Sequence, residues 1–589
     1  MDEATRNPDG YPITRFEREF FTGRERFTFI GSGELGGKAH GLAKMGSVLE
    51  TRMRPLFEPA LSISIPRLSV ITTEFFDLFM KENDLFEIAY SDKRDEVKAH
   101  AFQRAPLPAR LAGDLRAITE QVHSPLAIRS SSMLEDAMFE PFASVYATKM
   151  VPNNLLDADS RFNKLSEAVK FVYASTFFKP ARDYMRAVSH FIEDEKMAVM
   201  IQEIVGNRFG NRFYPHVSGV MRSFNFYPFG NALPEEGIVE LALGLGRKIV
   251  DDGVSWPFSP AYPLTPPPFK SIGDMMKHTQ TKFWSVNMGK LHTYNPVEET
   301  EYLEEYDLED AERDGTLSRL ASTYNYIDNR VESGTFFKGP RIIDFSPILR
   351  DSDLRFSEML RTLLSECEDR LGEMVEIEFA ARLGCSPGDQ IEFGFLQARP
   401  MVVSTSDVTI DKGELDARGV LLSSETVLGN GVIDTIEDIV YIDPEGFDVR
   451  DSLEIASEIA DVNDRLLRDG KPYLLIGFGR WGTTDPCGGI PVDFSQINGA
   501  RVIVESTLPG LNFMLSQGSH FFHNVTSFKV FYFSQRHDSG RGIDWEWLKG
   551  RPVFFETRHV RHVRLDNPLI VKADGRSGRG VIIHEQHER

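Results

Sequence analysis

The chain has 589 residues and a formal net charge of -22, with 41% hydrophobic and 26% charged residues. This length exceeds what one hydrophobic core uses, so about two to four domains are expected. The strong negative charge argues against nonspecific binding to nucleic acid or to an anionic membrane.

Three widely separated cysteines indicate a reducing compartment and no disulfide framework. The polar first residues lack the apolar core of a signal peptide, and no run of about 18 apolar residues could span a membrane. The expected location is therefore cytoplasmic, with no membrane partner. Residues 1–20 are expected to form a loose N-terminal arm.

A strand, a glycine loop and a helix are predicted from Arg26 onward, in the segments RFTFI, GSGELGG and KAHGLAKMGSVLE. The spacing of Gly31, Gly33 and Gly36 fits a dinucleotide-binding fingerprint. However, the next strand, SISIPRLSVI, has no acidic residue at its end to hold a ribose. A tight structural turn explains the same glycines.

The glycine loop also differs from a Walker A motif. Gly37 and Lys38 match its Gly-Lys pair, but Ser32 stands where that motif begins with glycine. Ala39 stands where a Ser or Thr would bind magnesium. What remains is a loop with free backbone N–H groups and one lysine, which would suit a polyphosphate. The alternative is a surface lysine beside a turn.

Strands and helices alternate along the rest of the chain. Helices are predicted at 108–122, 163–190 and 356–373, and strands at 125–131, 196–205, 373–383 and 390–403. Six prolines in residues 256–270 indicate an extended excursion. The polar segment 404–419 is expected to be the main linker, followed by an α/β region with a β-rich end.

Four segments occur in the order found in a known family: GGKAHGLAKM, IPRLSVITTEFF, IRSSSMLEDAMFEPFASVYAT, and VEIEF with LQARP some twenty residues later. They resemble the N-terminal ATP-binding domain, also called the PEP/pyruvate-binding domain, shared by phosphoenolpyruvate synthase and pyruvate phosphate dikinase. The resemblance implies a multidomain α+β or α/β chain. An ATP-grasp-type domain with two subdomains would occupy residues 21–405, and a smaller C-terminal α/β domain of uncertain role would occupy 406–589.

The resemblance also implies a site for ATP and Mg²⁺, and it gives each residue of that site a role. The implied roles are phosphate binding by Lys38 and Arg129, lining of the adenine pocket by Gln202, Glu203 and Ile204, magnesium binding by Glu378 and Gln397, and contact of Arg399 with the transferred phosphoryl group.

The chemistry of phosphoryl transfer asks for the same residue types. It needs positioned positive charge and a site for a hard cation, and arginine matches phosphate oxygens with a planar fork. Strand geometry places Glu376 and Glu378 on one face, and Gln397 and Arg399 on one face of the next strand. The apolar residues between them predict that the opposite face is packed.

The stretch AIRSSSMLED, Ala127 to Asp136, is interpreted within this site. Its strand would deliver Arg129 to a phosphate, and its serines would cap a following helix. Glu135 and Asp136 are expected to orient Arg129 or that helix rather than to act as bases. A plain strand end and helix cap is the alternative.

The chain departs from the family in three ways. The family's GLGE turn is GLGR here, which puts Arg247 at an acidic position; a surface arginine or an extra phosphate contact explains it. No motif of the family's phosphohistidine domain is recognisable. The chain is also too short to include the family's barrel that binds phosphoenolpyruvate or pyruvate.

The region after residue 405 is less informative. A glycine-rich loop with Arg480 is either an anion nest or a structural turn around a buried Trp481. His520 and His523 are three residues apart; His520 is a candidate phosphoryl carrier, and structural histidines are the alternative. The four histidines nearer the C-terminus are expected to be exposed strand or terminal residues rather than a site: His559, His562, His584 and His587.

The favoured function is an ATP- and Mg²⁺-dependent phosphotransferase, a kinase in the broad sense, with Arg129, Arg399 and His520 as catalytic candidates. Its partners would be ATP and an unidentified phosphoryl acceptor, and a homo-oligomer or a partner subunit stays open. One alternative is a non-catalytic ATP-binding sensor or partner subunit with the same fold. Another is an NAD-dependent oxidoreductase that uses the glycine loop.

Overall fold

The chain divides into two compact units in a computed structural model. The first unit comprises residues 1–224, 229–249 and 253–400, and the second comprises 225–228, 250–252 and 401–589. The described residues are 11–133, 135, 145–187, 191–226, 228–250, 254–269, 271–291, 293–384, 390–401, 408–411, 413–483, 488–509, 530–539, 542–575 and 577–584. Among them, no helix is both long enough and apolar enough to cross a membrane.

One six-stranded sheet of the first unit, sheet A, contains the strand that carries Arg129. Its order is β1 (Thr14–Arg15), β2 (Phe27–Ile30), β4 (Leu68–Ile71), β7 (Met197–Glu203), β5 (Leu126–Ser132) and β6 (Thr148–Val151). The pairs β1–β2 and β2–β4 are parallel, and the remaining pairs are antiparallel. Helix α7 (Ala158–Ser175) packs on β5, β6 and β7.

A second six-stranded sheet, sheet B, contains the strand pair expected to bind metal. Its order is β12 (Trp256–Phe258), β11 (Ile238–Ala242), β10 (Val217–Arg222), β18 (Val375–Arg382), β19 (Ile391–Pro400) and β3 (Leu61–Ser64). The predicted pairing of β18 with β19 is confirmed, and it is antiparallel. One continuous hydrophobic cluster includes residues of both sheets, for example Val70 of sheet A and Phe393 of sheet B.

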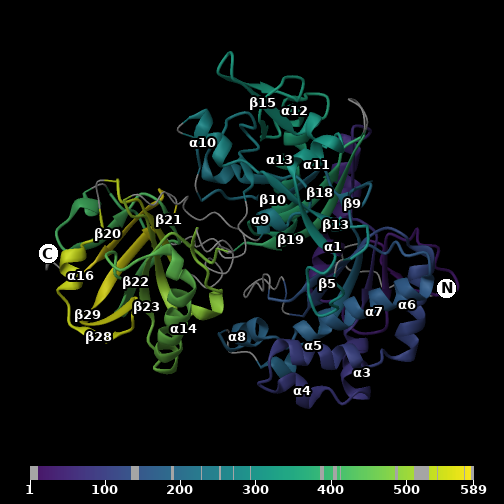
Figure 1. The fold of residues 1–589 in the computed structure, drawn as a ribbon, viewed down its shortest axis with the longest axis horizontal. Coiled ribbons are helices and arrows are strands. Elements are labelled where there is room, and N and C mark those ends of the chain that lie inside the picture. Colours follow the sequence, from purple (N-terminus) through teal and green to yellow (C-terminus); the bar gives the residue numbers. More distant parts are fainter. Residues whose placement is uncertain are drawn as a thin grey trace. The chain divides into compact units, whose positions relative to one another are not determined.

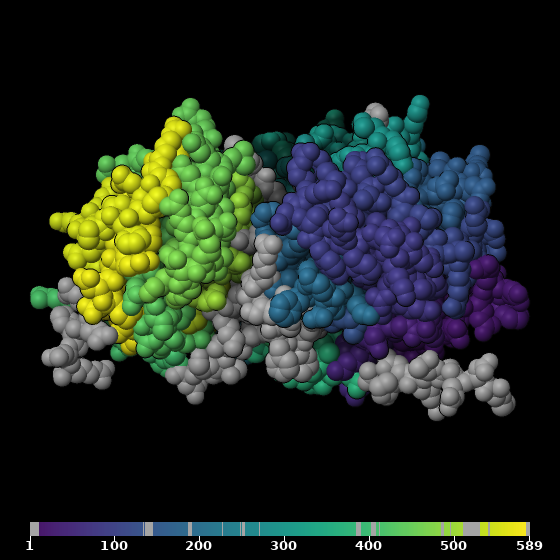
Figure 2. Space-filling view, turned by 90° about the horizontal axis from the view of Figure 1, so that it is seen from below, coloured from purple at the N-terminus to yellow at the C-terminus, as the bar shows by residue number. Residues whose placement is uncertain are grey.

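Helices surround these sheets (Figure 1). The bounds of the helices of the first unit, besides α7, are α1 Gly37–Val48, α2 Arg54–Phe57, α3 Thr73–Glu82, α4 Phe86–Tyr90, α5 Asp95–Arg104, α6 Ala109–Gln121, α8 Lys179–Ala187, α9 Arg247–Val250, α10 Ile272–Lys277, α11 Leu308–Arg313, α12 Ser346–Arg350 and α13 Phe356–Leu371. The predicted helices at 108–122 and 356–373 are thus present. In Figure 2, the purple to blue residues form a continuous part of the surface of this unit, where helices α3 to α6 cover its core.

Two smaller sheets complete the first unit. One has the order β14 (Leu303–Asp307), β13 (Lys282–Asn287), β9 (Arg212–Tyr214) and β8 (Asn207–Phe209), and the other has the order β16 (Arg330–Ser333), β15 (Ala321–Asn325) and β17 (Arg341–Ile343). The proline-rich segment contributes only β12 to a sheet, as expected for residues with few free N–H groups.

The loose arm expected at residues 1–20 is wrong for residues 11–16. Tyr11 and Ile13 are 5% and 6% exposed and belong to the main hydrophobic cluster. Strand β1 follows them and pairs with β2, with Thr14 opposite Thr28. The alternation of apolar and polar residues from Tyr11 onward fits an edge strand with one buried face. This segment therefore belongs to the fold.

The second unit is built around a nine-stranded sheet, in which eight strands follow one another and the ninth, β28, pairs with β29 off this path. The path is β20 (Val420–Ser424), β30 (Arg579–Ile583), β29 (Val560–Asp574), β22 (Gly431–Ile442), β23 (Tyr473–Phe478), β26 (Ala500–Ser506), β27 (Phe531–Gln535) and β21 (Val427–Leu428), with β28 (Val553–Glu556) on β29. Its other elements are β24 (Arg480–Trp481), β25 (Gly489–Ile490), α14 (Ser452–Arg468) and α16 (Trp545–Lys549). Strands β22, β23, β26 and β27 are mutually parallel, so this unit is α/β, with the β-rich end predicted for it.

Candidate functional site

Two glycines bring the start of helix α1 against strand β5. Gly36 has a positive φ of 78°, and a Cβ atom there would overlap the carbonyl oxygen of Ser131. A Cβ atom on Gly37 would overlap the carbonyl oxygen of Glu135. Only glycine permits this approach of two backbones. As a result, the next residue, Lys38, faces the end of β5.

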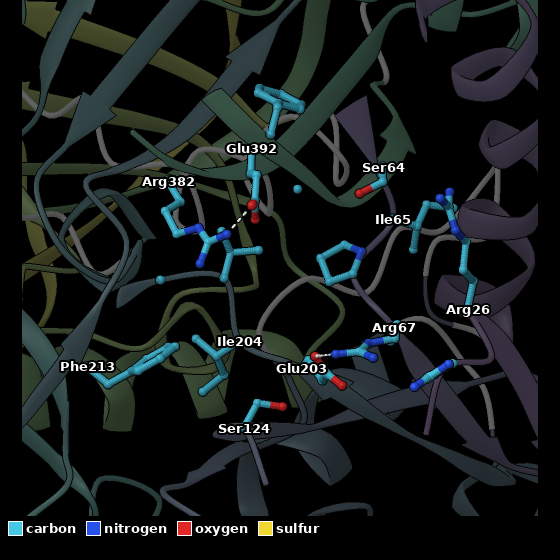
Figure 3. Close-up of a pocket in the computed structure, with 16 residues that line it drawn as sticks. Arg26, Ser64, Ile65, Arg67, Ser124, Glu203, Ile204, Phe213, Arg382 and Glu392 are labelled. Atoms are coloured by element: carbon cyan, nitrogen blue, oxygen red, sulfur yellow. Dashed lines mark hydrogen bonds and ion pairs between the residues drawn. The ribbon is translucent and has the colours of Figure 1, made fainter. Parts of the chain in front are cut away.

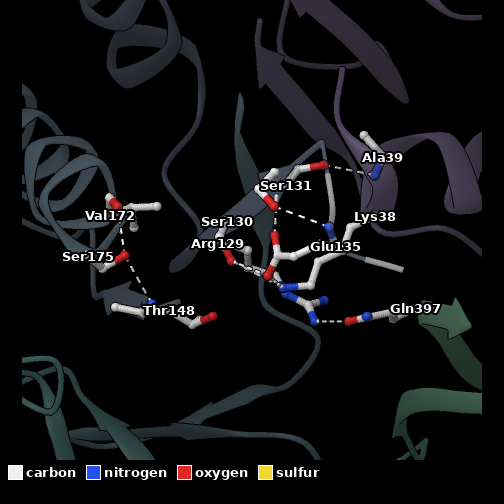
Figure 4. A network of polar contacts seen from close by, with 12 residues as sticks. Lys38, Ala39, Arg129, Ser130, Ser131, Glu135, Thr148, Val172, Ser175 and Gln397 are labelled. Carbon is white, nitrogen blue, oxygen red and sulfur yellow. Dashed lines mark hydrogen bonds and ion pairs between the residues drawn. The ribbon is translucent and has the colours of Figure 1, made fainter. Parts of the chain in front are cut away.

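Lys38 is part of a buried polar network (Figure 4). Its Nζ donates to Glu135 Oε1 at 2.7 Å and to Ser130 Oγ at 3.1 Å. Glu135 is 1% exposed, and its Oε2 accepts from the backbone N–H of Ser132 at 2.8 Å. The surface-lysine alternative is therefore wrong. A carboxylate holds the ammonium group in the position that a phosphate would compete for.

One serine of the AIRSSSMLED stretch has a partner that the prediction did not name. Ser131 Oγ accepts from the N–H of Ala39 at 3.1 Å, so it caps the first turn of α1. Ser132 Oγ accepts from the N–H of Glu135 at 3.1 Å, and residues 136–144, where the following helix is expected, lie outside the described residues. Glu135 orients Lys38, not Arg129. The reason is the close approach at Gly36, which puts this stretch beside a helix distant in sequence. Asp136 lies outside the described residues.

Three backbone N–H groups of the glycine loop, those of Ser32, Gly33 and Glu34, donate to side chains, whereas the sequence predicted free N–H groups. Glu74 Oε2 accepts from the N–H of Ser32 at 2.6 Å, and Thr72 Oγ1 accepts from that of Gly33 at 3.2 Å. The hydrogen bond from the Ser32 hydroxyl lowers the pKa of Glu74. Because side chains satisfy these donors, the loop loses its support as a pyrophosphate nest, and the NAD-dependent alternative loses its motif.

Arg129 connects sheet A to sheet B. Its Nη2 donates to Gln397 Oε1 at 2.8 Å and to Glu378 Oε2 at 3.3 Å. Its Nη1 donates to the carbonyl oxygen of Leu396 at 3.1 Å and to Gln202 Oε1 at 3.4 Å. The structure therefore brings together Arg129 and both predicted metal ligands, and Glu378 stands directly opposite Gln397 in the strand register.

A β-bulge at Leu396 aims Gln397 away from the core. On β19, Phe393 and Phe395 belong to the hydrophobic cluster, and strict alternation would place Gln397 there too. Instead, Phe395 pairs with Phe379 and Gln397 with Glu378, so Leu396 has no partner in the register. The extra residue reverses the alternation beyond it.

A second group of buried charges lies two register pairs further along. Arg399 is opposite Glu376 and forms an ion pair with it. Glu376 Oε2 also accepts from Arg222 Nε at 2.6 Å, and Arg222 Nη1 donates to Glu240 at 2.9 Å. Sequence reasoning missed Arg222 and Glu240, because nothing in the strand SGVMRS or in GIVELALG marks their pairing. Arg399 is 3% exposed, so its implied contact with a phosphoryl group would require it to leave Glu376.

A pocket of about 470 Å³ lies where strands of sheets A and B end (Figure 3). Ile204 and Phe213 line one side of it, with Glu203 paired to Arg67 at 2.9 Å. Arg382 and Glu392 form an ion pair across from them. Two of the three residues implied for the adenine pocket, Glu203 and Ile204, thus line a real cavity.

Gln202, the third of these residues, does not line that pocket. It is 1% exposed, and its side chain faces Arg129. Alternation along β7 explains the difference, because Gln202 and Glu203 point to opposite faces of sheet A.

Residues 32–417, about two thirds of the chain, match the family described as pyruvate phosphate dikinase, AMP/ATP-binding domain. The chain belongs to this family. No curated protein sequence matches the chain. The family assignment confirms the resemblance seen in the four sequence segments, and it supports ATP binding by this domain.

Several other residues that the sequence analysis singled out in this dikinase-family chain are not part of the site described above. His520 and His523 fall outside the described residues. The guanidinium of Arg247 stacks over Trp284 at 5.2 Å from the ring centre. In the second unit, Trp481 is fully buried, and its Nε1 donates to the carbonyl oxygen of Val504 at 3.2 Å.

Two of the C-terminal histidines differ from expectation. His559 and His562 are 7% and 4% exposed rather than on the surface. His562 Nε2 lies 2.7 Å from Asp438 Oδ1, and Asp438 also accepts from Arg564. The polar residues around them in the sequence suggested exposure, but β29 is an inner strand of the large sheet.

A buried acid next to the Lys38 network should make stability depend on pH. Burial, together with the nearby Glu135 carboxylate, raises the pKa of Glu195 to about 7. Glu195 is 3% exposed, and its Oε1 accepts from the N–H of Met133 at 3.2 Å. Because the folded chain holds this proton more tightly than the unfolded chain, its contribution to stability is complete below about pH 4.5 and is lost as the pH rises through about 7.

We therefore expect Glu195→Gln to make the free energy of unfolding depend less on pH. Between about pH 5 and about pH 8, the free energy of unfolding of the wild type should fall by on the order of 3 kcal/mol more than that of the variant. Urea denaturation at both pH values measures this difference. The neighbouring exposed residue provides the control, since Glu193→Gln should keep the wild-type profile. Identical profiles for Glu195→Gln and wild type would contradict the prediction.

Proposed function

We propose that this chain is an ATP- and Mg²⁺-dependent phosphotransferase of the dikinase type, with an ATP-grasp-type first unit. The observation that carries the proposal is the convergence of Arg129, Glu378 and Gln397 from two sheets, beside the buried Lys38 network. Phosphoryl transfer depends on positioned cations and a hard-cation site, and this arrangement offers both.

Lys38 and Arg129 are the phosphate-binding residues in this proposal. Each now contacts carboxylate or amide oxygens, which hold its cation in place before ATP arrives. The phosphate oxygens would replace some of those acceptors, so little reorganisation of the cations is needed. Glu135 keeps Lys38 positioned and does not act as a base, because it is buried and satisfied by several donors.

Glu378 and Gln397 fit a magnesium ion. Both offer oxygen atoms, and both oxygens approach the same nitrogen, Nη2 of Arg129, which marks a position where positive charge is favourable. Magnesium takes one or two protein oxygens and completes its shell with phosphate and water. When bound, it would neutralise charge on the phosphates and align the group being transferred.

The base of ATP would occupy the pocket that contains Ile204 and Glu203. Gly394 lines that pocket and Gln397 binds Arg129, so the two features are three residue steps apart along β19. At about 3.3 Å per residue this is roughly 10 Å, a suitable span between an adenine ring and the terminal phosphates. Ile204 and Phe213 provide the apolar contact that such a ring requires.

The proposal is tested by incubating the full chain with ATP and Mg²⁺ and identifying the nucleotide and phosphate products. Formation of AMP or ADP that requires Mg²⁺ supports a phosphotransferase. The variant Glu378→Gln should need about ten-fold more Mg²⁺ for half-maximal turnover, because it loses a charged ligand. Tight ATP binding without any product would instead favour the alternative, a non-catalytic ATP-binding sensor or partner subunit.

His520 stays a proposal as the carrier of a phosphoryl group between ATP and the acceptor. Support comes from its chemistry and from the family, whose members use a phosphohistidine. The same incubation with radiolabelled ATP tests it, because phosphohistidine is labile in acid and stable in base. Label that is absent from the wild type, or unchanged in His520→Asn, would favour direct transfer to a bound acceptor.

A further inference from the structure

A buried histidine of the second unit faces two glutamates from a neighbouring helix. Glu454 and Glu458 are four residues apart on α14, so their side chains lie on one face of that helix. His559 lies just before β29, and its side chain is 5% exposed. One ligand atom from each of the three side chains lies within 4.8 Å of the others.

The distances around His559 suit a shared metal ion better than a hydrogen bond. His559 Nε2 is buried and makes no hydrogen bond to any residue that the structure describes. Its nearest carboxylate oxygen, Glu454 Oε2, is 3.6 Å away, beyond the usual range of about 2.7–3.2 Å for N–H···O. Two ligands that each lie about 2.1 Å from a tetrahedral zinc ion are roughly 3.4 Å apart.

The surrounding contacts hold these ligands in place. The backbone N–H of His559 donates to Glu458 Oε2 at 2.9 Å, and Thr557 Oγ1 donates to the same oxygen at 2.5 Å. Asp451, directly before α14, places Oδ2 at 4.0 Å from His559 Nε2. Three carboxylates thus surround the imidazole. Arg558, which donates to Glu454 at 2.9 Å, is the neighbouring cation, and its side chain is 65% exposed.

We propose that Glu454, Glu458 and His559 bind a divalent transition-metal ion of the zinc class, with Asp451 or water as a further ligand. An imidazole nitrogen combined with carboxylates favours such an ion over Mg²⁺ or Ca²⁺, which prefer oxygen ligands only. The ion would join the N-terminal turn of α14 to the segment before β29. This site is independent of the ATP site, because all of its residues belong to the second unit.

The test is calorimetric titration of the full chain with Zn²⁺ after removal of metals by a chelator, in the absence of nucleotide. The variants are Glu454→Gln, Glu458→Gln and His559→Gln, and the matched control on the same helix is Asp464→Asn, an exposed residue. We expect wild type and control to bind one more Zn²⁺ per chain than the variants, or to bind it at least about ten-fold more tightly. Zn²⁺ should also raise the melting temperature of wild type and control by several degrees, through binding to the folded state alone.

Zinc binding that is equal in wild type and in all three variants would overturn the proposal. Equally tight binding of Mg²⁺ at these residues would overturn the choice of a transition metal. If no metal binds, the proposal fails. Should His559→Gln fail to fold, Glu454→Gln still decides the question, because the Glu454 side chain is 49% exposed.

Discussion

Replacing Arg129 by alanine is expected to lower kcat/KM for ATP by about 100- to 1000-fold, the usual loss for one preorganised charged donor. Part of this loss is binding: a charged contact to phosphate contributes about 1.5–3 kcal/mol, or roughly ten- to a hundred-fold in affinity. The fold should survive, because the Arg129 side chain is 12% exposed and its partner Glu378 is 21% exposed and can be solvated. Calorimetry and steady-state kinetics measure the two effects separately.

Arg129→Lys is the informative matched variant. It keeps the charge, but it loses the planar fork that now reaches Gln397, Glu378 and the carbonyl oxygen of Leu396 together. We expect it to recover part of the affinity and little of the turnover. Arg52→Ala, which removes a surface arginine paired with Glu366, should change neither. Unchanged ATP affinity in both Arg129→Ala and Lys38→Ala would contradict the assignment of this site.

Much of this site could be predicted because strand alternation and short motifs act locally. Strand alternation predicted that Glu376 and Glu378 share one face and that Gln397 and Arg399 share another, and the resemblance implied that Glu378 faces Gln397, as the register has it. The bulge at Leu396 was not predictable, because the sequence FLQ looks like continuous alternation. Only the pairing of the two strands, with Phe395 opposite Phe379 and Gln397 opposite Glu378, reveals where the extra residue lies.

Interactions between distant segments were the main source of error. A serine of β5 could be predicted to cap a helix, but nothing local indicates that Ser131 caps α1, about 90 residues earlier. Likewise, nothing near the glycine loop signals that Glu74 and Thr72 satisfy its N–H groups. In the second unit, the burial of His559 depends on α14, about 100 residues before it. Local patterns carry no information about such partners.

Removing the charge of Glu376 is expected to destabilise the first unit by about 3–5 kcal/mol, the usual cost when one partner of a buried ion pair is lost. Glu376 is 3% exposed and lies between two guanidinium groups, those of Arg222 and Arg399. In Glu376→Gln, both guanidiniums lose a charged acceptor, and Arg222 keeps its ion pair with Glu240. The free energy of unfolding from urea denaturation measures the loss.

The surface pair of Arg52 with Glu366 provides the matched control for this prediction. Glu366→Gln should change stability by less than about 1 kcal/mol, because solvent screens the pair. The double variant Glu376→Gln, Arg399→Gln should lose less than the sum of the two single variants, since it also removes one of the uncompensated charges. If Glu376→Gln were as stable as Glu366→Gln, the group around Glu376 would not support the fold.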